Sequence, residues 1–152
     1  MKRFSLIISL LMFFALYTSS QNINEINGVY YADSTPYTGQ YTTYFENGNT
    51  NVQMTLKDGL KDGEVKIYFE NGKLNEIRNY KNGKMDGTWI TYNDEAQKIA
   101  LANYKEGVKN GKWLIWNDNG KLIYEMMYAE GNKVGTWKKY DEVGELISER
   151  TF

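Results

Sequence analysis

Five acidic residues stand 24 positions apart and are the first candidates for chemistry: Glu46, Glu70, Asp94, Asp118 and Glu142. Two carboxylates that converge in a cleft can hydrolyse a glycosidic bond, and several can hold a metal ion with oxygen atoms at about 2 to 2.6 Å. A regular interval argues against both, because it distributes the acids along the molecule. We therefore interpret this set as a candidate acidic rim, made of solvated turn residues or of charges that attract a partner.

The chain contains no cysteine and no histidine, which narrows the chemistry further. It has no thiol nucleophile, no disulfide, no thiolate or imidazole ligand for zinc and no histidine for acid–base catalysis. We expect no enzyme, no cofactor and no metal, with a carboxylate-based hydrolase as the alternative. The balance of 18 basic and 19 acidic residues gives no reason to expect nucleic acid as a partner.

Aromatic residues form two rows with the same interval. The first row is Trp89, Trp113 and Trp137, and the second is Tyr68, Tyr92, Trp116 and Tyr140. Rings at intervals of about 10 Å can grip an extended glycan or peptide, or they can stack as a buried ladder. We favour the ladder for the tryptophans, because a hairpin array without disulfides needs buried rings. The rows differ in strand parity, so aromatic side chains should lie on both faces and form a candidate binding surface on at least one.

The elements that must position these residues follow from five glycines spaced 24 residues apart, which we call the anchor glycines: Gly39, Gly63, Gly87, Gly111 and Gly135. Such a period predicts a stacked array in which each unit contacts only its neighbours. In the unit that begins at Gly111, residues 112–116 and 122–128 have the composition of strands. The Asn119-Gly120 pair predicts a tight turn with positive φ at both residues, and residues 130–135 predict a looser turn. The sequence thus predicts an all-β fold, a single elongated, twisted antiparallel meander of β-hairpins.

The period also defines unit boundaries. Five units occupy residues 39–62, 63–86, 87–110, 111–134 and 135–152, and residues 21–38 form a degenerate N-terminal capping hairpin. In the third unit Glu95-Ala96 replaces the Asn-Gly pair, which predicts a looser or longer turn. Each unit advances the sheet by about 10 Å, so the acids in the turns are too far apart to share one ion.

The first 20 residues are typical of an export signal. Lys2 and Arg3 precede an apolar run at residues 4–17, and Thr18, Ser19 and Ser20 are suitable for cleavage before Gln21. The run is shorter than the about 20 residues that span a bilayer, which favours a removable signal peptide over a membrane anchor. We therefore expect an exported protein that is periplasmic, on the cell surface or secreted.

The segments between strand pairs share the pattern Y-x-x-G-x-x-x-G-x-W, at residues 80–89, 104–113 and 128–137. This pattern resembles the MORN repeat. Together with the turns that follow, it is similar to the MORN variant of the bacterial YwqK family, which is often labelled as the antitoxin of toxin–antitoxin pairs. The resemblance covers residues 39–152. It implies β-hairpin arrays that associate with proteins or membranes and have no catalytic residues.

The sequence therefore predicts an exported, non-enzymatic repeat protein that acts as a protein-binding platform or scaffold in the bacterial envelope. An antitoxin-like or immunity-like role is one form of this function. The alternative is binding of a glycan or a membrane lipid headgroup through an exposed aromatic face. The identity of the partner and the oligomeric state stay open.

Overall fold

The computed structural model describes residues 22–152. The expected signal peptide, with its cleavage site before Gln21, lies outside the described residues. Every regular element from residue 22 onward is a β-strand. This part of the chain contains no helix long and apolar enough to cross a membrane.

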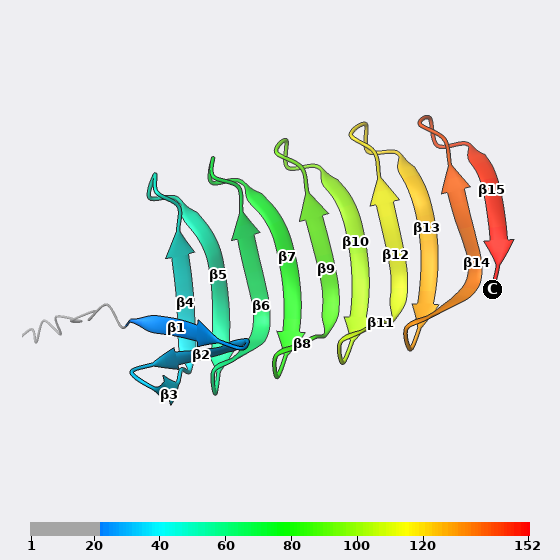
Figure 1. Ribbon diagram of the computed structural model, residues 1–152. Coiled ribbons are helices and arrows are strands. Elements are labelled where there is room, and N and C mark those ends of the chain that lie inside the picture. Colours follow the sequence, from blue (N-terminus) through cyan, green and yellow to red (C-terminus); the bar gives the residue numbers. More distant parts are fainter. Residues whose placement is uncertain (1–21) are drawn as a thin grey trace, which may run out of the picture.

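Twelve strands form the body of the molecule, a single antiparallel sheet. Ten of them follow one another through the sheet: β4 (Gly39–Tyr44), β5 (Thr50–Lys57), β6 (Leu60–Tyr68), β7 (Leu74–Lys81), β9 (Gly87–Tyr92), β10 (Lys98–Lys105), β12 (Gly111–Trp116), β13 (Leu122–Ala129), β14 (Asn132–Tyr140) and β15 (Leu146–Thr151). The short strands β8 (Lys84–Met85) and β11 (Val108–Lys109) pair with β7 and β10. Figure 1 shows one elongated, twisted layer, which confirms the predicted all-β meander of hairpins.

The turns between units are tighter than expected. Each contains two consecutive residues with positive φ, such as Asn82 (φ 48°) with Gly83 (φ 78°) and Glu106 (φ 48°) with Gly107 (φ 90°). Two central residues of positive φ define the type I′ turn, whose twist matches that of the strands it joins. The prediction of a looser connection at these positions is therefore wrong.

The turns inside units are the wider ones. In the fourth unit, Asn117 N–H donates to the Lys121 carbonyl at 2.9 Å, and Gly120 N–H donates to the Asn117 carbonyl at 2.9 Å. Gly120 has a φ of 71°, but Asn119 is not among the residues with positive φ. The prediction of positive φ at both residues is therefore wrong. The Asn117 side chain accounts for the wider turn, because its Oδ1 accepts the Asn119 and Lys121 N–H groups at 3.1 and 2.9 Å.

The third unit has the same turn as the others. Asn93 N–H donates to the Gln97 carbonyl at 2.9 Å, and Ala96 N–H donates to the Asn93 carbonyl at 2.9 Å. Ala96 occupies the position of the missing glycine with a φ of 63°. The expectation of a looser or longer turn is wrong, because the backbone keeps its conformation and places an alanine in the left-handed region.

We expect Ala96→Gly to stabilise the protein. An L-residue in the left-handed region costs about 1 kcal/mol relative to glycine, so unfolding should require about 1 kcal/mol more. The melting temperature should rise by about 3 °C, measured by circular dichroism. Gly72 is the matched control, since it holds the equivalent position at a φ of 84° and an added Cβ would lie 3.8 Å from its nearest neighbour, Asn49 Nδ2. Gly72→Ala should lower the melting temperature, and a neutral Ala96→Gly would refute the strain.

Side-chain alternation gives the sheet two different faces. Trp113 and Ile115 share one face of β12, and Leu114 and Trp116 share the other. Ile115 pairs with Tyr124 and Trp116 with Leu122, so the extra residue of this β-bulge lies in β13 and the alternation along β12 is kept. We call the side with the three tryptophans the aromatic face, and the other side the opposite face.

A separate three-stranded sheet precedes the first unit: β1 (Ile23–Ile26), β2 (Val29–Ala32) and β3 (Thr35–Pro36). We call it the cap. It has one strand more than the predicted hairpin, and it lies across the first strands of the main sheet (Figure 1). Tyr30 N–H donates to the Gly59 carbonyl at 2.8 Å, and Gly59 N–H donates to the Tyr37 carbonyl at 2.8 Å. These bonds fasten the cap to the turn between the first and second units.

The core of the described chain lies where the cap meets the aromatic face. Its buried hydrophobic side chains are Tyr30 from the cap and Met54, Leu56 and Val65 from the main sheet. Leu56 is 1% exposed and Val65 is 3% exposed. Tyr41 packs against this cluster, with its ring centroid 5.8 Å from that of Tyr30. The first two units thus acquire a second layer.

Candidate binding surface

Seven aromatic rings form a continuous ladder along the aromatic face, in the order Tyr80, Trp89, Tyr104, Trp113, Tyr128, Trp137 and Phe152. Neighbouring ring centroids lie 4.9 to 5.6 Å apart, and the ring planes are inclined by 47° to 63°. Inclined rings at this distance attract one another through their edges and faces. Each tryptophan therefore packs between two other rings, one from its own unit and one from the unit before it.

The indole groups also connect neighbouring units through hydrogen bonds. Trp89, Trp113 and Trp137 donate their N–H groups to the backbone carbonyls of Asn79, Asn103 and Met127, at 3.1, 3.1 and 3.0 Å. Each of these carbonyls belongs to the return strand of the preceding unit. The tryptophans are half-buried. They therefore hold the array together and still present part of their surface to a ligand.

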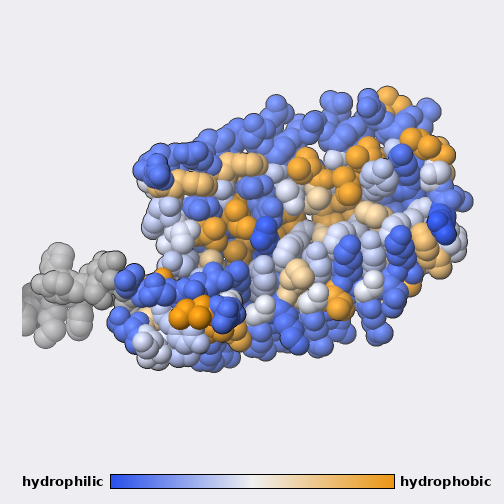
Figure 2. Space-filling model, in the orientation of Figure 1, coloured by the Kyte–Doolittle hydropathy of each residue, from blue (hydrophilic) through white to orange (hydrophobic). Residues whose placement is uncertain are grey.

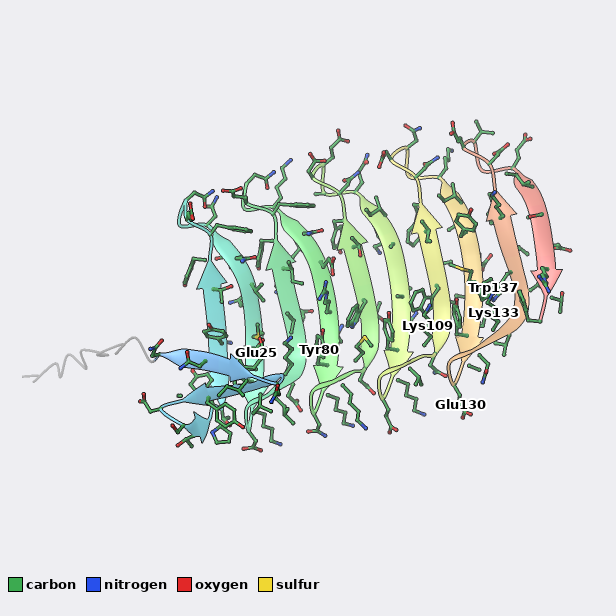
Figure 3. The ribbon with its side chains drawn as sticks, viewed as in Figure 1. Glu25, Tyr80, Lys109, Glu130, Lys133 and Trp137 are labelled. Atoms are coloured by element: carbon green, nitrogen blue, oxygen red, sulfur yellow. The ribbon has the colours of Figure 1, made fainter. Side chains whose placement is uncertain are left out.

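Cationic side chains lie over the ladder. Lys109 Nζ is 4.2 Å from the Trp113 ring centroid, and Lys133 Nζ is 4.6 Å from that of Trp137. The Arg78 guanidinium carbon is 5.0 Å from a Trp89 ring. The π electrons of an aromatic ring attract a cation at these distances. Figure 3 shows Lys133 beside Trp137, and Lys109 lies over Trp113 in the same way, so the aromatic face carries positive charge.

The cap covers only the beginning of the aromatic face. Within residues 22–152, the buried cluster beneath the cap reaches along the ladder only as far as Tyr80. Figure 2 shows apolar side chains along the middle of this side of the molecule, between polar rims. A shallow depression of about 320 Å³ lies here, and its lining includes Arg78, Trp89, Ala100, Tyr104 and Trp113.

The second aromatic row lies on the opposite face and does not join the ladder. It consists of Tyr68, Tyr92, Trp116 and Tyr140, all half-buried, and continues from Tyr44, which is 64% exposed. The sequence-predicted surface residues are therefore divided between two sides of the sheet. One ligand cannot contact both rows at once, so Trp89, Trp113 and Trp137 form the candidate surface of the aromatic face.

The five carboxylates of the candidate acidic rim are solvent-exposed at the turns inside the units: Glu46, Glu70, Asp94, Asp118 and Glu142. Their backbones have a structural role. The Glu70 carbonyl accepts a hydrogen bond from Asn47 Nδ2 at 2.9 Å, and the Glu142 carbonyl accepts one from Asn117 Nδ2 at 3.0 Å. Within residues 22–152, no group of three or more acidic side chains lies close enough together to hold a metal ion.

The sequence reasoning missed two components of the surface. Tyr80, Tyr104, Tyr128 and Phe152 complete the ladder, and their regular spacing was visible in the sequence. Lys109 and Lys133 lie two residues before the anchor glycines Gly111 and Gly135, and Trp113 and Trp137 lie two residues after them. This constant spacing could have indicated that each lysine lies near a tryptophan. The extent of the cap had no such signal, because residues 22–38 lie outside the repeat.

Comparison with known families agrees with this architecture. A family model described as the MORN repeat variant matches residues 37–58, 61–82, 109–130 and 133–152. The third hairpin, β9 with β10, lies outside these matches and has the same register and turn as its neighbours. A search of curated proteins found no match. MORN repeats generally serve in binding to proteins or membranes. Since the matched segments make up more than half of the sequence, this chain belongs to the MORN repeat variant family.

Proposed function

We propose that this protein is an exported, non-enzymatic binding platform and that the uncovered part of its aromatic face receives a protein partner. The observation that carries the proposal is the unequal cover of this face. The cap buries Met54, Leu56 and Val65, whereas the ladder from Trp89 to Phe152 stays accessible. An accessible row of aromatic side chains on a rigid sheet is typical of a protein-binding surface.

The charges on this face indicate the chemistry of the partner. Arg78, Lys109, Lys133 and Arg150 each lie within 5 Å of a ring centroid of the ladder. A partner segment with aromatic or aliphatic side chains and carboxylates would match both the rings and the cations. The same cations support the second candidate function, binding of an anionic lipid headgroup or an acidic glycan.

Two tyrosines of the aromatic face and the cap are poorly suited to act as general bases. Burial is the main cause that raises the pKa of Tyr30 to about 12, and the nearby Glu25 adds to it. Burial also raises the pKa of Tyr104 within the ladder. A general base works best with a pKa near the working pH, and both shifts move away from neutrality. These hydroxyls therefore stay protonated at neutral pH, and their rings serve in packing.

Export is part of the proposal and rests on the basic and apolar residues that precede Gln21. The intact mass of the protein recovered from the cell envelope should correspond to a chain that begins at or near Gln21, and material that still carries Lys2 would contradict export. An assignment to the YwqK family and an antitoxin-like role belong to the same proposal. An exported antitoxin would have to act on a target in the envelope.

A charge placed in the depression tests the binding function. Ala100 lines this depression, has a small side chain and is half-buried. It pairs with Thr91 on the aromatic face. We expect Ala100→Glu to keep the melting temperature within a few degrees. It should also reduce partner capture from envelope extract by more than tenfold, since a carboxylate would oppose an acidic partner.

The matched control is Thr55→Glu, an exposed position on the opposite face, which should leave capture unchanged. Equal capture by both variants and the unmodified protein would contradict a partner site on the aromatic face. Vesicles of anionic lipid and a glycan array, tested with the same variants, separate the second candidate function from protein binding.

A further inference from the structure

A row of apolar side chains crosses the opposite face in the middle of the sheet. Ile77 pairs with Ile90, Ile90 with Leu101, and Leu101 with Leu114, so the row runs without interruption across β7, β9, β10 and β12. Side chains directly opposite one another in neighbouring strands lie about 5 Å apart and are in contact. All four are partly exposed. They form a continuous apolar strip on a face that the cap does not touch.

The repeats themselves show that the fold does not need this strip. The same positions in the outer units hold polar side chains: Gln53, Lys66, Glu125, Lys138 and Glu149. The hairpins that contain these residues keep the same pairing as the central ones. An apolar strip confined to the central strands therefore has a reason other than the formation of the sheet, and association is the common one.

The two ends of the strip carry opposite charges. Lys66 pairs with Ile77 at one end, and Glu125 pairs with Leu114 at the other. The Lys66 side chain is 40% exposed and that of Glu125 is 31% exposed. Each charge lies one strand beyond the last apolar residue of the strip. When a second copy of the strip is laid against the first in the opposite direction, the cation of each copy meets the anion of the other.

A two-fold axis parallel to the strands reverses the strip in this way. With the axis between β9 and β10, β6 of one copy faces β13 of the other. Ile77 then meets Leu114, Ile90 meets Leu101, and Lys66 meets Glu125 on both sides of the axis. A two-fold interface requires this kind of self-complementary surface, in which each contact occurs twice.

The neighbours of the two charges extend the match. Glu64 lies beside Lys66, with 3.1 Å between Oε1 and Nζ, and Lys112 lies beside Glu125, with 3.7 Å between Nζ and Oε1. In the two-fold arrangement, Lys66 of one copy faces Glu125 of the other, and Glu64 of the first copy then lies on the side of Lys112 of the second. Each end of the interface would therefore hold two positive and two negative charges in alternation.

We propose that this chain forms a two-fold homodimer through the opposite face, with the Ile77–Leu114 strip at its centre and Lys66 paired with Glu125 at both ends. Six strands about 4.8 Å apart and about six residues long cover about 600 Å² per copy, or about 1,200 Å² in total. This area is at the lower end for specific complexes, so the dimer should dissociate in the micromolar range. The dimer leaves the aromatic faces of both copies pointing outward for partner binding.

Sedimentation equilibrium of the chain from Gln21, which contains every described element, tests the proposal. We expect dimer between about 1 and 200 µM, the range suited to an interface of this size. Leu101→Glu should raise the dissociation constant more than tenfold. Ala100→Glu, the neighbouring residue on the aromatic face, should leave it unchanged. A monomer throughout this range, or equal dissociation constants for the two variants, would overturn the proposal.

Charge reversal gives a second test that does not disturb the apolar strip. Lys66→Glu and Glu125→Lys should each weaken the dimer at least fivefold, because each places like charges together twice in the dimer. The protein with both substitutions should regain most of the affinity, because the opposite charges face each other again. A double variant no tighter than the single ones would exclude this two-fold arrangement. Loss of partner capture by Ala100→Glu with an intact dimer separates this proposal from the proposed function.

Discussion

Trp113→Ala should lower the free energy of unfolding by about 3 kcal/mol, the lower end of the range for truncation of a large aromatic side chain, because this indole is half-buried. Its ring centroid lies 5.3 Å from those of Tyr104 and Tyr128, and its N–H donates to the Asn103 carbonyl at 3.1 Å. The substitution removes all three contacts and leaves Lys109 without its ring. Because Trp113 joins the third and fourth units, its loss should also uncouple the two halves of the array.

Urea unfolding followed by tryptophan fluorescence and circular dichroism measures both effects. Trp116→Ala is the control of matched residue type on the opposite face, outside the ladder, and should cost about half as much. In the wild type, the fluorescence and circular dichroism transitions should coincide. Two separate transitions in Trp113→Ala would show that the halves of the array unfold independently. If the alanine variants of Trp89, Trp113 and Trp137 all keep their stability and lose partner binding, the rings serve the ligand and not the array.

Gly59→Ala should destabilise the protein by about 3 kcal/mol or more, since it combines backbone strain with displacement of the cap. Gly59 has a φ of 77°, and an added Cβ would lie 2.5 Å from Val29 Cγ1 and 2.9 Å from the Tyr30 carbonyl oxygen. The second contact is with backbone, so the cap must move. Movement of the cap breaks the Tyr30–Gly59 hydrogen bond and opens the cluster around Leu56 to water.

Gly107 supplies the control for strain alone. It holds the same place in another type I′ turn at a φ of 90°, and no atom lies within 4 Å of its added Cβ. Gly107→Ala should therefore cost only about 1 kcal/mol. Limited proteolysis gives an independent measure, because cleavage within residues 22–38 should accelerate in Gly59→Ala and not in Gly107→Ala. Equal losses of stability in the two variants would mean that the cap contributes little.

The sequence alone determined the repeating architecture. The anchor glycines, the alternation of strand residues and the spacing of Trp89, Trp113 and Trp137 all have the same period, so each hairpin could be recognised from its own residues and its neighbours. This succeeded because contacts in a repeat array are local: every strand of the main meander pairs with a strand close to it in sequence. The parity of the two aromatic rows was predictable for the same reason, since the bulges beside the turns inside the units fall in the second strand of each hairpin, as in β13 and β5.

Turn geometry and the cover of the faces required the tertiary structure. The turn type depends on side-chain hydrogen bonds such as those of Asn117, and backbone pairing on both sides forces Ala96 into the left-handed region. The position of the cap depends on contacts between residues distant in sequence, since Tyr30 bonds to Gly59 and packs in the cluster with Leu56. Both faces of the repeat carry half-buried apolar side chains, so composition cannot say which face the cap will bury. The docking of the cap decides this, because Val29 and Tyr30 fit closely against Gly59. The cap therefore covers one end of the aromatic face and leaves the rest of that face accessible.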